Sequence, residues 1–349
     1  MTQTDLALLV QLDRTALAKI ERGTRRLSAT ELVAIASALD RPIDWFVAES
    51  PPSVVSRRSD AAASGHSRSL DLKIERLARD VGFLVADEVL RDVGTRPALD
   101  MPSDVNGAEH LAGQARMKMD VPPGPLENLQ RAVERVGLLA FSLDLGEAGG
   151  DAAYVEVGNL GVALLNGHVD PGRRRFNLAH ELGHHLFGDA YAPEVAVNAS
   201  SETERLINAF AVHLLLPRND ITEHWQSHQD EDPRMIAVGL SFRFRASWTA
   251  TCNQLRTLEL IDDTERNSYV SRPPTAADAI ALGVRWVAEL DVPAVPPQYG
   301  KRVLAAYTAG KLTAVRTFEL LWGTVSLADL PEQRSVPLES LRRDLEPLS

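Results

Sequence analysis

The stretch DPGRRRFNLAHELGHHLFG at residues 170–188 decides how the rest of the sequence is interpreted. Asp170 is a suitable N-cap and Pro171 suits the first helical position, because its missing N–H has no partner in a helix. Gly188 follows the last apolar turn and provides a helix stop. These signals together predict one continuous helix between Asp170 and Gly188.

Two histidines lie four residues apart within that helix. His180 and His184 are therefore about 40° apart around the helix axis, so both imidazoles can reach one Zn²⁺ from the same face. Glu181 lies between them in the His-Glu-x-x-His pattern and is predicted to act as the general base on a water molecule. The alternative interpretation is a surface helix with scattered histidines. His185 lies about 100° from His184 and is interpreted as a flanking side chain, not a ligand.

A zinc peptidase needs a third protein ligand, and a second segment offers one. The sequence SSETERLINAFAVHLLLP at residues 200–217 places Glu204 and Asn208 four apart, hence on one helix face. We predict Glu204 as the third ligand and Asn208 as a hydrogen-bond partner for a ligating histidine. As alternatives, Glu204 completes a capping box with Ser201 at a helix start, and Asn208 is simply a polar helix residue.

Two other ligand arrangements fit the sequence less well. The metzincin pattern needs Gly three residues after the second His and His six after it, but Phe187 and Ala190 occupy those positions. Glu202 is a weaker substitute for Glu204, because it lies on a different helix face from Asn208.

Composition narrows the class of protein. The 349 residues include 44% hydrophobic and 24% charged residues, which is typical of a soluble globular protein with two or three domains. The net charge of −11 disfavours a surface that is basic throughout, so any DNA contact must be local. The single cysteine excludes an internal disulfide, and the N-terminus lacks a secretion signal. We expect a cytoplasmic protein without a membrane partner.

Apolar periodicity predicts a multidomain, mainly α protein. Its parts are a small all-α domain, an α+β domain with a small antiparallel sheet that carries the two motifs, and a helical C-terminal region. The strands are expected in LLAFSLDL, AYVEV and GVALLN, after Gly137. The predicted ranges are 1–50 for the small domain, 51–69 for a linker, 70–124 for a bridging helix (70–97) and an irregular connection (99–125), 125–270 for the peptidase domain, and 275–349 for the C-terminal domain. The helices that follow the two motifs within 125–270 resemble a winged-helix-like bundle.

The two motifs together resemble the ImmA/IrrE family of bacterial intracellular metallopeptidases. The resemblance is carried by RRRFNLAHELGHHLFG and ETERLINAFAVHLLLP and covers about residues 125–262. It implies a zincin-like fold, a Zn²⁺ cofactor, and proteolysis that releases genes from a repressor. Where the family usually reads Glu-Ala-Asn before the Phe-Ala pair, this chain has Leu206-Ile207-Asn208, which leaves Glu204 as the matching acid.

The N-terminal sequence resembles a helix-turn-helix of the XRE/Cro type. The matching text is TQTDLALLVQLDRTALAKIERGTRRLSATELVAIASALDRPIDWF at residues 2–46. The resemblance implies a recognition helix that begins near Asp13 and operator DNA as a partner. It also implies that the chain starts at the second helix of the motif, so that either translation begins upstream or the domain is incomplete.

Specific residues of this segment are predicted to contact DNA. Base-reading positions would be Arg14, Thr15, Ala18 and Lys19, and phosphate-facing positions Gln3, Arg22, Thr24 and Arg25. Residues 1–47 carry six basic and six acidic side chains and so have no net charge. The alternative interpretation is therefore a helical protein-interaction module.

These observations lead to one main functional hypothesis and two alternatives. The main hypothesis is a cytoplasmic zinc endopeptidase that regulates transcription by cleaving a partner helix-turn-helix repressor at one site. The first alternative is a non-proteolytic DNA-binding regulator that uses the peptidase-like domain as a sensor. The second is a component of a toxin–antitoxin or phage operon. Dimerisation is one role considered for residues 275–349.

Overall fold

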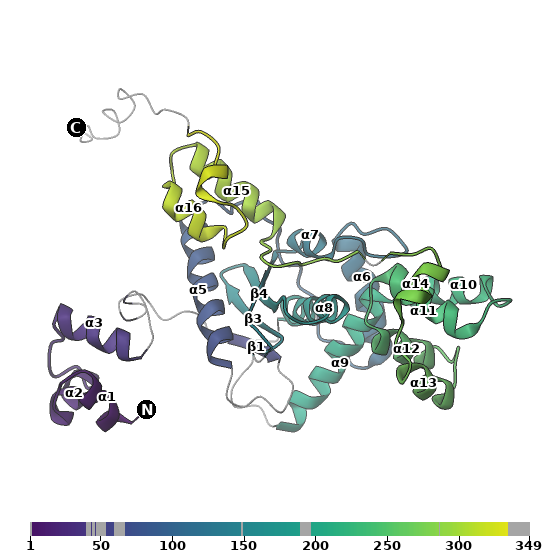
Figure 1. Ribbon diagram of the computed structural model, residues 1–349, viewed down its shortest axis with the longest axis horizontal. Helices are drawn as coiled ribbons and strands as arrows, with labels where there is room; N and C mark the ends of the chain where they lie inside the picture. The colour runs from purple at the N-terminus through teal and green to yellow at the C-terminus, as the bar shows by residue number, and fades with distance from the viewer. Residues whose placement is uncertain are drawn as a thin grey trace. The chain divides into compact units, whose positions relative to one another are not determined.

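The computed structural model describes residues 2–39, 43, 46, 54–58, 67–147, 149–188, 197–285 and 287–333. The chain divides into two compact units, Met1–Pro51 and Pro52–Ser349, which are described separately (Figure 1). Three predicted features lie wholly or partly outside the described residues. They are the linker apart from 54–58 and 67–69, the position of Ala190, and the end of the C-terminal region beyond residue 333.

Residues 2–39 of the first unit form three short helices, as the sequence predicts. They are α1 (Gln3–Leu9), α2 (Arg14–Glu21) and α3 (Ala29–Ala38). Each helix starts at a side-chain cap: Thr2 and Ser28 form capping boxes, and Asp13 accepts a 2.7 Å hydrogen bond from the Ala16 amide. Leu6, Leu17 and Ile35 are buried between the helices and form the centre of a small core.

The second unit is built around a mixed four-stranded sheet. Its strands are β1 (Val54–Arg58), β2 (Leu138–Leu143), β3 (Ala152–Val157) and β4 (Leu160–Asn166), in the spatial order β1-β3-β4-β2. Two sequence expectations are wrong here. The sheet is not purely antiparallel, because β2 pairs in parallel with β4. Residues 54–58, expected in the linker, pair antiparallel with β3.

The parallel pair follows from the tight turn between β3 and β4. Gly158 has φ 61°, a left-handed conformation that suits glycine, and it lets β4 fold back directly onto β3. The turn inserts β4 between β3 and β2. The chain leaves β2, crosses to β3 and returns, so β4 runs in the same direction as β2. The sequence showed three short apolar strands but not this crossing.

One face of the sheet is covered by helices from both ends of the unit. They are α5 (Ser67–Ala86), α15 (Pro297–Thr308) and α16 (Ala314–Leu320), followed by a short 3₁₀ turn at Leu327–Asp329 (Figure 1). Ile74 of α5 and Tyr299 of α15 are buried in the same core, where Tyr299 meets Phe141 of β2 edge to face at 5.0 Å. Residues 70–97 were predicted as a bridging helix, but α5 packs on the sheet. The C-terminal helices share that core and form no separate one.

On the other face, α7 (Leu129–Glu134) and α8 (Pro171–Phe187) contact the strands, and α9 (Val197–Leu215) packs on α8 and on α6 (Val105–Lys118) in the same core. Helix α6 corrects the expectation of an irregular connection at 99–125. It is capped by Asp104 and buries Ala108, Ala112 and Ala115. Alanines at helical spacing produce little apolar contrast in the sequence, although they pack closely in the structure.

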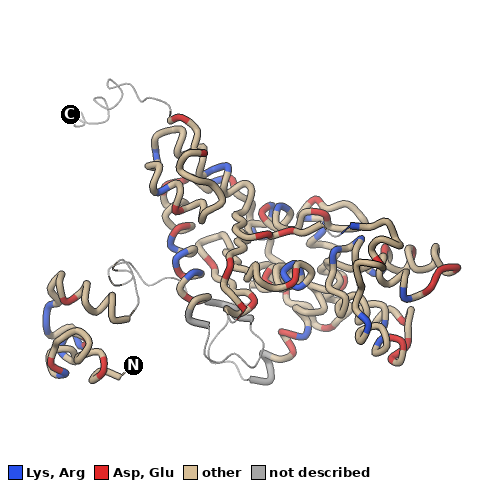
Figure 2. The backbone as a smooth tube through the Cα atoms, viewed as in Figure 1, with Lys and Arg blue, Asp and Glu red and all other residues tan. Residues whose placement is uncertain are grey.

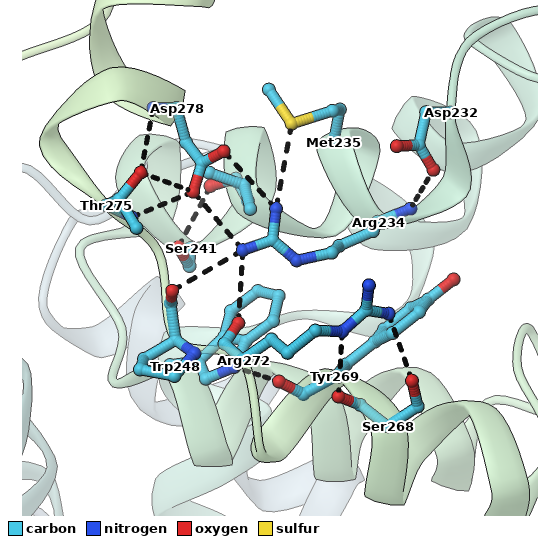
Figure 3. Close-up of polar contacts among 12 residues, drawn as sticks. Asp232, Arg234, Met235, Ser241, Trp248, Ser268, Tyr269, Arg272, Thr275 and Asp278 are labelled. Carbon is cyan, nitrogen blue, oxygen red and sulfur yellow. Dashed lines mark hydrogen bonds and ion pairs between the residues drawn. The ribbon is translucent and has the colours of Figure 1, made fainter.

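Five further helices follow α9: α10 (Arg218–Ser227), α11 (Pro233–Phe244), α12 (Trp248–Thr257), α13 (Asp263–Val270) and α14 (Ala276–Ala281). The predicted turn near Arg245 is confirmed, because Arg245 ends α11 with φ 52° and Ser247 caps α12. Figure 3 shows how these helices are joined: Arg234 of α11 reaches Asp278 of α14 at 3.2 Å and lies over the Trp248 ring.

This cluster leads to a prediction about acid stability. Hydrogen bonds from Arg234 and then from Thr275 lower the pKa of Asp278 to about 2. A lowered folded-state pKa stabilises the protein above the unfolded value near 3.8, and this contribution disappears as the pH falls through about 2. We therefore expect Asp278→Asn to lower the melting temperature, by an amount that shrinks as the pH falls from about 4 to 2. Thermal unfolding at several pH values measures this.

The matched control for this prediction is Asp230→Asn, at an exposed aspartate between α10 and α11. It reports the effect of losing one surface carboxylate without the Arg234 contact. A difference between wild type and Asp278→Asn that stayed constant over the same acid range would contradict the prediction.

Candidate metal centre

Helix α8 is set up by the residues that the sequence singled out. Asp170 accepts hydrogen bonds from the amides of Gly172 and Arg173 at 2.9 and 3.3 Å, and Pro171 occupies the first turn. Gly188 ends the helix in the left-handed conformation with φ 64°. The predicted start and stop are both confirmed, so the register of the intervening histidines is the expected one.

His180 and His184 lie on one side of α8 and are both buried. Their rings meet edge to face with centroids 4.9 Å apart, and their Nε2 atoms are 3.1 Å apart. Two nitrogens that share one Zn²⁺ at about 2.0–2.1 Å lie about 3.3 Å apart at the tetrahedral angle. The spacing of the two Nε2 atoms therefore suits a single shared cation.

Glu204 of α9 approaches the same point. Its carboxylate oxygens lie 3.3 Å from Nε2 of His180 and 3.5 Å from Nε2 of His184. One ligand atom from each of the three residues falls within a 4.8 Å cluster. Two imidazoles and one carboxylate form a donor set typical of catalytic zinc, with the fourth position left for water or substrate. The Glu204 side chain is 47% exposed, so the cluster is accessible from that side.

Close packing of two helices brings Glu204 to the histidines. A Cβ atom built on Gly183 of α8 would lie 2.8 Å from Cγ2 of Ile207 on α9, so any larger residue would push the helices apart. The edge-to-face contact of Phe187 with Phe210 continues this interface. Ser201 lies inside α9, four residues after its start, so the alternative interpretation of Glu204 as a capping residue is wrong.

Asn208 lies one turn after Glu204 and contacts the other side of His180. Its Oδ1 is 3.1 Å from Nδ1 of His180. An N–H at Nδ1 that donates to this oxygen leaves the Nε2 lone pair directed at the cluster. The structure thus brings together all four residues predicted for the metal centre: His180, His184, Glu204 and Asn208. Their roles stay predictions.

Glu181 is fully buried on α8. Burial raises the pKa of the Tyr154 hydroxyl on β3, and the nearby negative charges of Glu156 and Glu181 raise it further. The carboxylate of Glu181 is therefore close enough to act on β3 electrostatically. Its predicted role as general base stays a prediction.

His185 faces away from the cluster, in agreement with its interpretation as a flanking side chain. Its Nδ1 is 3.0 Å from the Tyr154 hydroxyl and its Nε2 is 2.8 Å from the carbonyl oxygen of Val136. Burial lowers the pKa of His185 to about 4, so the ring is neutral at pH 7. Gly161 makes room for it, because a Cβ there would lie 2.5 Å from Nδ1.

Sequence reasoning missed the arginines that anchor the start of α8. Arg175 is fully buried, pairs with Glu289 and donates a 2.6 Å hydrogen bond to the carbonyl oxygen of Leu126. Arg174 reaches Asp291 at 3.2 Å. The available signal was the Arg-Arg-Arg run near a helix N-terminus, where the helix dipole disfavours cations unless they have specific partners.

The predicted DNA-contacting residues are gathered on the first unit, chiefly on α2. Arg14, Thr15 and Lys19 are exposed there, whereas Ala18 is half-buried. The remaining candidates contact the unit itself: Gln3 donates to Glu21, Arg22 to the carbonyl oxygen of Ala18, Thr24 to that of Lys19, and Arg25 to Glu31. Figure 2 shows basic and acidic positions interspersed along this unit.

Comparison with known families supports the resemblances. Residues 133–256 match the IrrE N-terminal-like domain, a peptidase family model, and residues 1–46 match a helix-turn-helix model. The first match spans β2 through α12 apart from the last residue, and it includes the whole metal cluster. No similar sequence was found among curated proteins. Within the described residues, no helix is long and apolar enough to cross a membrane.

Proposed function

We propose that this chain, in which residues 133–256 match the IrrE N-terminal-like peptidase domain and residues 1–46 match a helix-turn-helix model, is a zinc-dependent endopeptidase of the ImmA/IrrE type that controls transcription. The observation that carries the proposal is the convergence of Nε2 of His180, Nε2 of His184 and the Glu204 carboxylate within 4.8 Å. This donor set leaves one coordination position for a reactant, as a catalytic zinc site requires.

The proposed mechanism assigns each residue one task. His180 and His184 hold the ion together with Glu204, and Asn208 keeps the His180 ring oriented through Nδ1. Bound Zn²⁺ would supply the Lewis acidity that polarises the scissile carbonyl and activates water. Glu181 takes the proton of the attacking water at its carboxylate and delivers it to the nitrogen of the leaving amine.

This assignment predicts the metal content of purified protein. We expect about one Zn²⁺ per chain in the wild type and a loss of that metal in His184→Ala, because two remaining ligands bind a catalytic ion much more weakly than three. Elemental analysis by mass spectrometry measures this directly. The matched control is His224→Ala, at a histidine of α10 outside the cluster, which should keep its metal. Full zinc retention in His184→Ala would remove His184 from the site.

We propose a helix-turn-helix repressor as the substrate. A peptidase attached to a module that binds DNA is concentrated near DNA-bound proteins, which raises the effective concentration of one substrate above others. Incubation with repressors encoded nearby, followed by intact-mass analysis, should give two fragments from cleavage at one extended site. Indiscriminate degradation of unfolded casein would contradict this specificity.

The first unit is proposed to bind operator DNA through α2. Lys19→Ala should weaken binding to an operator near the gene by about tenfold or more, because a lost base contact costs about 1–3 kcal/mol. Affinity should also fall as salt rises, since binding releases counterions. Fluorescence anisotropy at several salt concentrations measures both effects.

The control for this titration is Arg91→Ala, which removes one exposed positive charge from the second unit. It should leave DNA affinity nearly unchanged. Equal losses in the two variants would indicate a general charge effect, and no binding by the wild type would favour the protein-interaction module.

A further inference from the structure

Strand β1 differs from the other three strands of the sheet in its origin. It comes from residues 54–58, near the start of the second unit, whereas β2, β3 and β4 all lie inside the matched peptidase domain at 133–256. β1 forms the outer edge of the sheet and pairs only with β3, and its register shifts between Val54 and Ser56. A five-residue edge strand with an irregular register is weakly held compared with a central strand.

The register places β1 next to β3, a strand that packs on α8, the helix carrying the two histidines of the candidate metal centre. Ser56 is opposite Tyr154 of β3, whose hydroxyl is 3.0 Å from Nδ1 of His185, the residue next to His184. The charge of Glu181 acts on the same tyrosine. β1 also contacts α8, the helix that carries these residues.

We propose that β1 occupies the sheet edge on which an extended peptide substrate pairs, so that β1 and the substrate compete for the same edge of β3. This inference rests on the proposed peptidase function. Without β1, the outer edge of β3 would present unpaired amides and carbonyls along a strand that packs on α8, the helix carrying His180 and His184. An extended peptide satisfies such an edge by adding a strand, and main-chain hydrogen bonds provide most of its affinity.

The covalent connection of β1 to the rest of the second unit explains how a weakly held strand can stay paired with the edge of β3. A segment joined to the domain by a short linker acts at an effective concentration in the millimolar range, so it excludes weaker free peptides. A substrate must therefore displace β1, which a repressor held near the first unit achieves more readily than a dilute bystander. The competition adds a restraint on general proteolysis.

Direct binding of the linker sequence tests this proposal without any need for catalysis. The probe is a fluorescein-labelled peptide of residues 52–60, measured by anisotropy against the zinc-loaded full chain carrying Glu181→Gln to prevent cleavage. Residues 54–58 are replaced by Gly-Ser-Gly-Ser-Gly in one protein, and residues 61–65 are replaced in the same way in the control. We expect the peptide to bind the strand-replaced chain at least about tenfold more tightly than the control chain.

A second variant keeps the test decisive if the replacement reduces solubility. Neighbouring amides of a strand point in opposite directions, so the double substitution Ser56→Pro and Arg57→Pro removes one donor facing β3 whichever way the strand is turned. The labelled peptide should therefore also bind this double-proline variant more tightly than it binds the control chain. A scrambled peptide of the same composition should bind every chain weakly.

The outcomes separate this inference from the proposed function. Equal affinity for the strand-replaced and control chains, or no binding to the strand-replaced and proline variants, would overturn the competition between linker and substrate. If the peptide binds as expected but no peptide or repressor is hydrolysed, the peptidase function fails while competition at the sheet edge stands. If both hold, kcat/KM for an extended reporter peptide rises when residues 54–58 are replaced.

Discussion

Glu181→Gln is expected to keep zinc and lose peptide hydrolysis, with kcat/KM falling by about 10²–10⁴-fold. Glu181 is assigned to proton transfer and is absent from the cluster of ligand atoms, so the amide should disturb neither the ion nor the fold. Glutamine has nearly the same shape but cannot accept the proton of the attacking water. Elemental analysis and intact-mass measurement of cleaved repressor, made on the same preparation, test both parts.

The control for this variant is Glu202→Gln on α9. Glu202 is exposed and paired with Arg205 at 2.6 Å, and its sequence position had made it the weaker candidate for the third ligand. Activity and zinc content should stay close to wild type in this variant. Wild-type cleavage by Glu181→Gln would remove Glu181 from the mechanism, and loss of zinc would turn its role from proton transfer to coordination.

The positions of the two histidines in the candidate metal centre could be predicted because the information for them is local. Two histidines four residues apart need only a helix to share a face, and Asp170 and Gly188 fixed where that helix starts and ends. Glu204 was harder, because it lies on another helix whose approach depends on tertiary packing. The small residue that permits the approach, Gly183, was present in the motif, but its partner Ile207 became evident only in three dimensions.

The features that sequence reasoning missed all depend on long-range contacts. The parallel pairing of β2 with β4 follows from the path of the chain and leaves no mark on the apolar pattern of either strand. Helix α6 packs through buried alanines, whose small side chains allow close contact with neighbouring elements. The strand at 54–58 has a linker-like composition around it and forms because β3 offers an unpaired edge.

The buried ion pair at the start of α8 is expected to have a large effect on the stability of the fold. The side chains of Arg175 and Glu289 are 1% and 9% exposed, and their ion pair joins helix α8 to the segment before α15. The Glu289 carboxylate also accepts a 2.8 Å hydrogen bond from the backbone N–H of Gln130 in α7. Glu289→Ala should therefore reduce the free energy of unfolding by about 3–5 kcal/mol, because it leaves a buried cation without its counter-ion. Urea denaturation followed by tryptophan fluorescence measures this loss.

Two controls distinguish a buried charge from a lost contact. Asp92→Ala breaks the Arg302–Asp92 pair, whose side chains are 40% and 66% exposed, and should cost no more than about 1 kcal/mol. In the double variant Arg175→Met and Glu289→Met, most of the lost stability should return, because the desolvated charge itself is gone. If the double variant were as unstable as Glu289→Ala, the anchor would act through packing and the Gln130 hydrogen bond, not through charge. The position of α8 would then depend on how the side chains at positions 175 and 289 pack. Zinc affinity should in that case fall in parallel with the free energy of unfolding in both Glu289→Ala and the double variant.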